Sequence, residues 1–397
     1  MAAEILLYIS CLGIILLLGL FCAFISNRLR IPHPLFLILI GLFLGNFYYN
    51  KALLISFSSG FIAFVAAFAS AIIIFDYSSK VRVRELDSLS TSAFYLGLVF
   101  FIFNSAILSF VIYKLLRPDS YLYALLFAIA ISGTSYPILS FLGKQKNKVL
   151  SLLETESVLT TPFILIFAFL MLEVIKQKIN LSSFTVINML PFAQKIAIGA
   201  GIGLLMGILL FNVLRKNYFE LLSPLTILTS SLASYAFAEQ LGGNGFLAAA
   251  TAGFLFGNFR IEERKKIQEF FSIISFLAIL MVLILAGFLT KTSFDINYLV
   301  LASFLFGVSI LIRFLSVLVV FSDSKYNLDE KIFMSLNIPQ GINTGLIVLV
   351  LILGSYWSSM IPVLVIFMIY SIILSTLMTH FSKSFIRTEH LHNKETQ

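Results

Sequence analysis

Charged residues are scarce in this sequence. They make up 12% of the 397 residues, whereas 59% are hydrophobic and the mean hydropathy is +1.01. A soluble domain normally carries about twice that charged fraction, so water cannot be the main solvent of this chain. The composition excludes an ordinary soluble enzyme and indicates an all-α polytopic membrane protein.

Cysteine is rarer still, and the residues of metal and cofactor sites are nearly missing. Cys11 and Cys22 lie on one expected helix and are too far apart for a disulfide, so we interpret them as packing residues. His380, His390 and His392 cluster in a polar tail, which favours a solvated segment over a metal site. Phosphate loops, dinucleotide loops and catalytic triads are also lacking. The sequence predicts no enzyme, metal or cofactor.

Long hydrophobic runs, by contrast, fill the chain. Each run is near the ~20 residues that a bilayer-spanning helix needs. The thirteen expected spans cover residues 4–25, 33–49, 53–77, 91–114, 120–141, 150–173, 190–214, 221–239, 244–258, 270–290, 297–321, 333–354 and 360–380. One transmembrane domain therefore occupies residues 1–397, ending in a short tail at 381–397.

The distribution of lysine and arginine predicts the orientation of the chain. Loops that follow odd-numbered spans, together with the C-terminal tail, hold 19 of them, and the opposite side holds about 7. We expect the N-terminus outside and the C-terminus in the cytoplasm. The net charge of +8 is then explained by membrane orientation and lipid headgroups, and nucleic acid is not an expected partner.

Two spans contain residues that interrupt a helix. The fifth reads "ISGTSYPIL" and the twelfth "LNIPQGINTG". If the seventh span, at 190–214, is a connector, these two spans hold the same position in halves at 1–175 and 221–380. An odd connector makes the halves inverted, and paired broken helices indicate a transporter site. The expected broken-helix cavity is lined by Thr134, Ser135, Tyr136, Pro137, Pro339, Gln340 and Gly341. Two ordinary proline kinks are the alternative.

Two charges lie deep within expected spans. Glu156 is seven residues, roughly 10 Å, from the cytoplasmic start of span six, and Arg313 is roughly 12 Å from the cytoplasmic end of span eleven. Because a lone buried charge is costly and a paired one is tolerated, we predict an ion pair between them. The pair could be structural only, or it could shape an ion cavity.

Further polar residues and two glycine stripes lie within or at the ends of the expected spans. Thr160 and Thr161 precede Pro162, whose ring leaves a backbone carbonyl free, so their hydroxyls could bind a cation or satisfy the kink. Asp76 and Glu239 end their spans and are expected at the membrane interface. Glycine stripes at spacing four on spans two and seven favour close helix packing, with a dimer seam as a weaker option.

These motifs resemble the monovalent cation:proton antiporter superfamily, over nearly the whole chain. "AEQLGGNGFLAAATAGFLFGN" is the most specific stretch, and "LLETESVL" resembles the glutamate–serine entry into the family's ion-binding helix. Arg313 falls where similar exchangers place the arginine that pairs with that glutamate. The resemblance implies thirteen or so spans in inverted repeats, two crossed discontinuous helices and a homodimer. It also implies Glu156, Ser157, Thr160, Thr161 and Arg313 as transport residues.

The sequence departs from the family pattern at the ion site. Thr160 and Thr161 replace the usual Asn-Asp or Asp-Asp, and Gln340 replaces a frequent arginine. In the broken fifth span, this chain has Ser135-Tyr136-Pro137 where family members commonly have Thr-Asp-Pro. Since a hydroxyl does not titrate near neutral pH, the departures put proton coupling in question.

The resulting hypothesis is a secondary active transporter that exchanges Na+ or K+ for protons across the cytoplasmic membrane. The alternative is a divergent protein of the same fold that lacks proton coupling. Such a protein would carry out uncoupled or uncharged-solute transport, or act as a sensor or scaffold.

Overall fold

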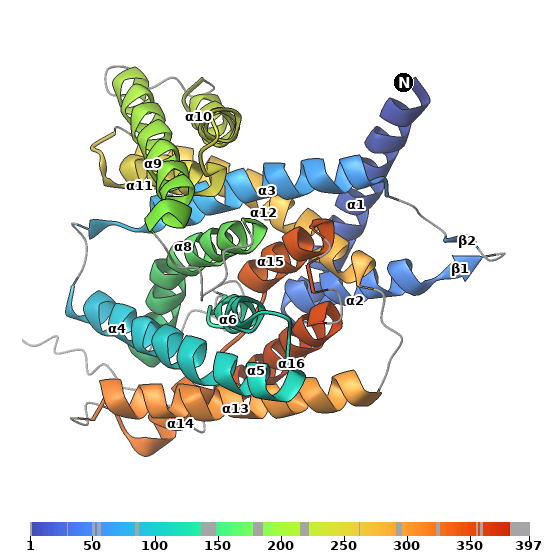
Figure 1. The fold of residues 1–397 in the computed structure, drawn as a ribbon, viewed down its shortest axis with the longest axis vertical. Helices are drawn as coiled ribbons and strands as arrows, with labels where there is room; N and C mark the ends of the chain where they lie inside the picture. Colours follow the sequence, from blue (N-terminus) through green and yellow to red (C-terminus); the bar gives the residue numbers. More distant parts are fainter. Residues whose placement is uncertain are drawn as a thin grey trace, which may run out of the picture.

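The computed structural model describes residues 2–29, 31–49, 52–53, 57–83, 87–135, 148–177, 186–214, 222–261, 263–290, 296–322, 326–354, 356–357 and 360–381. Helices dominate them (Figure 1). In chain order they are α1 (Ala2–Leu29), α2 (His33–Asn46), α3 (Ser59–Lys80), α4 (Ser88–Phe103), the π-helix η2 (Asn104–Leu108), α5 (Ser109–Leu116), α6 (Tyr121–Ala130), α8 (Lys148–Lys176), α9 (Val186–Leu214), α10 (Leu222–Gln240), α11 (Gly245–Asn258), α12 (Arg264–Leu289), α13 (Ile296–Val320), α14 (Leu328–Leu336), α15 (Ile342–Leu353) and α16 (Ile361–His380). A small hairpin pairs β1 (Tyr48–Tyr49) with β2 (Ala52–Leu53).

Each predicted span coincides, within the described residues, with one of these helices, with the pair α14 and α15, or with the run of α4, η2 and α5. Within the described residues, eight helices are long and apolar enough to cross a membrane, and α2, α6, α11 and α15 are shorter apolar helices. The prediction of an all-α polytopic protein is confirmed. The twelfth span is longer than predicted, because α14 already begins at Leu328 and precedes the break at 337–341.

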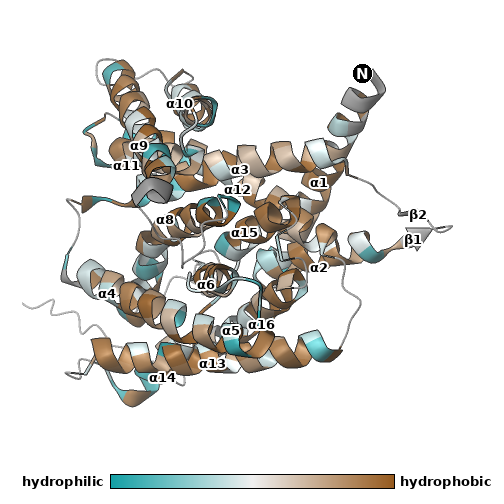
Figure 2. Cartoon of the chain, in the orientation of Figure 1, coloured by the Kyte–Doolittle hydropathy of each residue, from teal (hydrophilic) through white to brown (hydrophobic). Residues whose placement is uncertain are grey.

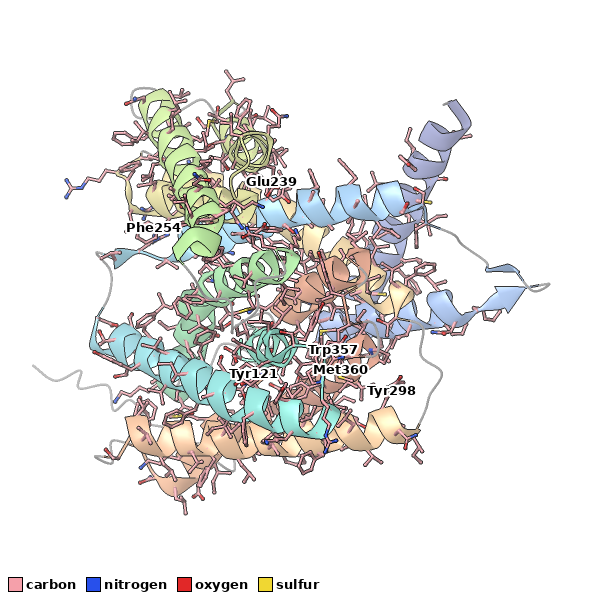
Figure 3. The ribbon with its side chains drawn as sticks, viewed as in Figure 1. Tyr121, Glu239, Phe254, Tyr298, Trp357 and Met360 are labelled. Atoms are coloured by element: carbon pink, nitrogen blue, oxygen red, sulfur yellow. The ribbon has the colours of Figure 1, made fainter. Side chains whose placement is uncertain are left out.

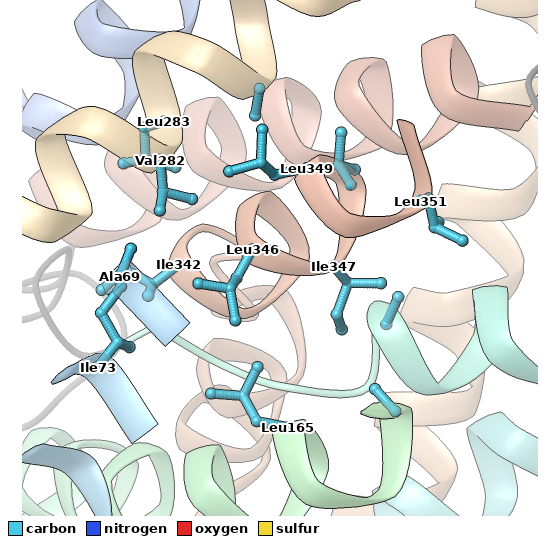
Figure 4. Close-up of a cluster of buried hydrophobic side chains, with 14 of the residues drawn as sticks. Ala69, Ile73, Leu165, Val282, Leu283, Ile342, Leu346, Ile347, Leu349 and Leu351 are labelled. Carbon is cyan, nitrogen blue, oxygen red and sulfur yellow. The ribbon is translucent and has the colours of Figure 1, made fainter. Parts of the chain in front are cut away.

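The helices differ in how much protein surrounds them. In the apolar windows of α3 and α12, 67% of residues are buried, against 28% in α1 and 22% in α9. α3 and α12 are therefore central, and α1 and α9 leave apolar side chains to face lipid (Figure 2). Figure 4 shows the centre of the core, where Ala69 of α3, Val282 of α12 and Leu346 of α15 gather. Side chains fill the spaces between the ribbons (Figure 3).

A short internal repeat packs in the same way in both halves. Residues 41–46 read GLFLGN on α2, and residues 253–258 read GFLFGN on α11. A methyl group at Gly45 would overlap the carbonyl of Phe288 on α12, and one at Gly257 would overlap the carbonyl of Ser79 on α3. α2 and α11 thus make the same kind of close glycine contact with a central helix, as expected if they hold matching positions in the two predicted repeats.

The glycine stripe of α9 has a different neighbour. A Cβ at Gly199 would overlap the carbonyl of Asn244, and one at Gly203 would overlap the carbonyl of Ala248, at the start of α11. The prediction that this stripe serves close helix packing is confirmed. Because α11 covers the stripe, it is not available as a dimer seam.

We predict that Gly45→Ala and Gly257→Ala each destabilise the protein by about 1–3 kcal/mol, because the added methyl group must push two helix backbones apart. Gly307→Ala is the matched control, since a Cβ there meets nothing within 4 Å, and it should be neutral or stabilise by up to about 1 kcal/mol. Thermal unfolding in detergent measures all three. Equal effects of the three substitutions would contradict the packing described here.

Candidate functional site

The helix α8 carries four polar residues into the core. Glu156, Ser157, Thr160 and Thr161 are all at most 3% exposed, although the helix around them is apolar. Positions 157 and 161 are four residues apart and share a helix face. Buried polar groups at this density need partners from neighbouring helices, and those partners define the site.

Glu156 pairs with Arg313 of α13. Both guanidinium Nη atoms donate to the carboxylate, Nη1 to Oε1 at 2.6 Å and Nη2 to Oε2 at 2.6 Å. The two side chains are 1% and 0% exposed, and the guanidinium also lies 5.0 Å from the centre of the Phe100 ring. The predicted ion pair is confirmed. Its bidentate geometry is what allows both charges to be buried.

The two broken spans meet directly. The amide of Ser135 donates to the carbonyl of Pro339 at 2.8 Å. The amide of Ile342, at the start of α15, donates in turn to the Ser135 hydroxyl at 3.2 Å. The predicted crossing is confirmed on these contacts, and α6 and α15 lie side by side in the middle of Figure 1. The expected site residues Tyr136 and Pro137 lie outside the described residues.

Side chains from the second break cover the carbonyl end of α6. Gln340 Nε2 donates to the carbonyl of Ile131 at 2.7 Å, and Thr344 Oγ1 donates to that of Ala130 at 2.9 Å. Thr344 also contacts Gln340 Oε1 at 3.2 Å. The free carbonyls at a helix C-terminus carry partial negative charge, and here uncharged groups satisfy them. Gln340 therefore supports the crossing without adding a charge.

α8 contributes to the same crossing through Thr134. Ser157 Oγ donates to the Thr134 carbonyl at 2.9 Å, and Thr161 Oγ1 lies 3.5 Å from it. Asn343 Nδ2 reaches Thr161 Oγ1 at 3.4 Å. Thr160 turns away from this group and donates to the carbonyl of Glu156 in its own helix at 2.8 Å. The two neighbouring threonines thus have different roles.

Two buried oxygen atoms at the crossing lack a hydrogen-bond partner within the described part of the chain. They are Thr134 Oγ1 and Asn343 Oδ1, on side chains 2% and 1% exposed. Unsatisfied buried acceptors are uncommon and call for an explanation such as a water or an ion. Both oxygen atoms belong to residues that contact Thr161, Thr134 through its carbonyl and Asn343 through Nδ2. Uncharged oxygens of these types are used by proteins to bind alkali cations.

Asn343 was not singled out from the sequence. It lies inside the quoted "LNIPQGINTG", two residues past Gly341, where its amide follows the break. Gly133 makes room for it, since a Cβ at that position would overlap Asn343 Nδ2. Its position next to a predicted break was the sequence signal that could have identified Asn343 as a site residue.

Asp76, expected near the membrane interface, is enclosed by protein near the end of α3. Its carboxylate is buried, accepts from Lys80 Nζ at 2.7 Å and from Ser272 Oγ at 3.2 Å, and joins α3 to α12. The ion pair with Lys80 compensates the burial. Glu239, labelled in Figure 3, is exposed as predicted and accepts from the amide of Gly245 at 2.9 Å.

A second buried carboxylate, Glu173, was missed. It lies near the end of α8 and pairs with Lys195 of α9 and, at 3.9 Å, with Lys176. The side chain of Glu173 is 12% exposed and that of Lys195 is 35% exposed. Because the pair lies at the rim and not at the crossing, it joins α8 to the connector helix.

Removal of one partner of the deep pair should strand the other charge. We predict that Glu156→Gln or Arg313→Gln alone destabilises the protein by about 3–5 kcal/mol, whereas Glu156→Gln combined with Arg313→Gln recovers most of the loss. Thermal unfolding in detergent measures the effect. Lys266→Gln is the control, because its pair with Glu263 is exposed and worth at most about 1 kcal/mol. Losses that simply add in the double variant would contradict the coupling.

Several known proteins resemble this chain in sequence. Residues 13–382 match the family model described as sodium/hydrogen exchanger, transmembrane. The chain is 27% identical over 366 residues to Na(+)/H(+) antiporter 1 of Methanocaldococcus jannaschii, covering 85% of this chain and 82% of the relative. It is 24% identical over 339 residues to the K(+)/H(+) antiporter NhaP of Alkalimonas amylolytica, covering 83% of this chain and 58% of that protein.

A solved structure supports the same assignment at the level of fold. The structure of the sodium proton antiporter MjNhaP1 from Methanocaldococcus jannaschii at pH 8 superposes with a TM-score of 0.76 at 21% identity, covering 96% of this chain and 98% of that one. The family model spans nearly the whole sequence. This chain therefore belongs to the sodium/hydrogen exchanger family.

Proposed function

We propose that this protein is a secondary active transporter that exchanges a monovalent cation, Na+ or K+, for protons across the cytoplasmic membrane. The observation that carries the proposal is the crossing of the two broken spans beside a buried, paired carboxylate. Relatives named as Na(+)/H(+) and K(+)/H(+) antiporters support it. Because both an Na(+) and a K(+) antiporter are among them, the comparison does not choose the cation.

The cation site that we propose consists of uncharged oxygens at the crossing. Its ligands are the carbonyl and hydroxyl of Thr134, the hydroxyl of Thr161 and the amide oxygen of Asn343. Ser157 orients the Thr134 carbonyl by its hydrogen bond at 2.9 Å. A partly dehydrated cation would gain from these dipoles what it loses in hydration. None of the groups titrates near neutral pH, so the site itself does not exchange protons.

The proton carrier that we propose is Glu156. It is held by Arg313 in a bidentate ion pair in the described state. Proton coupling thus requires the pair to open during the cycle, after which Glu156 could accept a proton or attract the cation. Glu156 and Thr160 share a helix with Thr161, so a movement of α8 against α13 would act on both the pair and the cation ligands.

The alternative is a transporter of the same fold without proton coupling. It is favoured by the replacement of the family's acidic residues with Thr160 and Thr161, and by the fully paired state of Glu156. In that case the pair holds α8 and α13 together throughout the cycle. Transport of a cation down its gradient, or of an uncharged solute, would remain.

The arrangement in the membrane belongs to the same proposal. We place the N-terminus outside, the C-terminal tail in the cytoplasm, a first repeat at 1–175, the connector at 190–214 and a second repeat at 221–380. The repeated glycine motif on α2 and α11 supports the two halves. The protein is proposed to be a homodimer, as in the family resemblance, and the exposed apolar side chains of α9, such as Leu205 and Leu209, offer a surface for it.

The cation site predicts different effects for neighbouring threonines. Thr161→Val should raise the half-saturating cation concentration about tenfold, because the lost oxygen contact contributes about 1–1.5 kcal/mol to binding. Thr160→Val is the matched control and should change it less than about threefold, because its hydroxyl only contacts its own helix. Flux into proteoliposomes at varied cation concentration measures both. Equal effects would argue against a site at Thr161.

Proton coupling is tested by the dissipation of a pH gradient in proteoliposomes on addition of Na+, K+ or Li+. We expect coupled flux in the wild type and none after Glu156→Gln. The double variant Glu156→Gln with Arg313→Gln should show the same loss and avoids a stranded charge that could unfold the protein. Glu263→Gln, at an exposed position, is the control.

A wild type without cation-dependent proton flux would favour the uncoupled alternative. Thr161→Asp, which restores an acidic residue beside the crossing, should then create coupled flux. Exchange that survives removal of Glu156 would contradict both proposals and would make the buried Asp76 the next carboxylate to replace.

A further inference from the structure

One face of α4 contacts both parts of the proposed site. Gly97, Phe100 and Asn104 are spaced by three and four residues, so they form a single stripe on this helix. A Cβ at Gly97 would overlap Thr160 Cγ2 and lie 3.3 Å from Glu156 Cγ. The Phe100 ring lies under the guanidinium of Arg313. Two residues of the stripe therefore pack against the ion pair.

The third residue, Asn104, contacts the broken span instead. Its Nδ2 donates to the carbonyl of Ala128 at 3.1 Å and to Ser132 Oγ at 3.0 Å. Ser132 Oγ itself donates to the same carbonyl at 2.6 Å. Asn104 is fully buried, and its amide closes a small network at the point where α6 ends.

The backbone around Asn104 is unusual. Asn104 opens η2, a π-helical segment of five residues between α4 and α5. A π-bulge adds one residue to a helical turn and is often found at functional sites. It changes the direction of the stripe at this point, so that the residues before it face the ion pair and Asn104 faces α6.

Asn104 also approaches the helix that carries the arginine. Ser309 Oγ of α13 lies 3.5 Å from Asn104 Oδ1. Ser309 and Arg313 are four residues apart and share a face of α13. The three residues Gly97, Phe100 and Asn104 thus contact α8, α13 and the end of α6.

We propose that Asn104 is a positioning residue that holds the end of α6 in register with the Glu156–Arg313 pair. Of the side chains that satisfy the last carbonyls of α6, Gln340 and Thr344 come from the other broken span and would move with it. Asn104 comes from η2, which continues directly from α4, the helix that packs on the pair. This role rests on the proposed function, since the register matters for transport through the Thr134 oxygens, which follow six residues after Ala128.

The first test replaces the amide by an apolar group of similar size. Asn104→Leu should raise the half-saturating cation concentration at least tenfold and change the maximal rate less, because the ligands are displaced before they bind. Ser105→Ala is the matched control, since it lies in the same π-helix and its hydroxyl has no partner in the described part of the chain. It should behave as the wild type.

The second test uses an acid of the same shape. An aspartic acid can donate to the Ala128 carbonyl only while it is protonated. The exchange rate of Asn104→Asp divided by that of the wild type should therefore fall as the pH rises, whereas the ratio for Asn104→Leu should be low at every pH. A ratio for Asn104→Asp that does not depend on pH would overturn the assignment of the amide as a donor.

A third measurement does not need transport. Hydrogen–deuterium exchange of the amides at 131–135, which the structure shows bonded at Ile131, Ser132 and Ser135, should be at least tenfold faster in Asn104→Leu than in Ser105→Ala. If amide exchange is faster in Asn104→Leu but the wild type transports no cation, the positioning role stands and the proposed function is refuted. Unchanged protection of these amides in Asn104→Leu would overturn the positioning role, whatever the flux.

Discussion

Glu156 and Arg313 are buried side by side with their head groups 2.6 Å apart, and neither charge could remain there alone. The pair fixes α8 against α13 over a face that also includes Phe100 of α4. Because the removal of a charge from water is costly, a half-open pair, with its charges separated but still buried, is disfavoured. A transporter that alternates between two states can use such a contact, since the intermediate arrangement is disfavoured.

The crossing depends on a second constraint, the need to satisfy backbone groups far from water. A broken helix frees carbonyls and amides, and this protein satisfies them with uncharged side chains such as Gln340, Thr344 and Ser135. The crossing is consequently polar, and the side chains that satisfy its backbone groups are uncharged. In the proposed function, dipoles bind the cation and the nearby Glu156 supplies the charge compensation.

Cation binding and proton binding are thereby separated in space. In a site with a single carboxylate, both ions compete for the same oxygens. In the proposed function, the candidate ligands Thr134, Thr161 and Asn343 lie at the crossing, whereas the candidate proton carrier Glu156 faces Arg313 of α13. Thr161 and Glu156 both lie on α8, so a movement of this helix would act on the two sites together. α4 packs closely against it, because Gly97 leaves room for the side chains of Thr160 and Glu156.

The spans, the two breaks and the ion pair could be predicted from the sequence alone. Hydrophobic length is a local property, glycine combined with proline in one apolar span favours a break, and the cost of a lone charge requires Glu156 to have a partner of similar depth. Proline without a nearby glycine did not suffice, since Pro162 lies within the continuous helix α8. The burial of Asp76, the turning of Thr161 rather than Thr160 toward the crossing, and the contacts of Asn104 and Asn343 there became visible only in the packed helices. These contacts depend on the rotation and register of each helix, which are set by how glycine stripes and side chains of distant spans interlock, and a change of one residue in register would turn a different face inward.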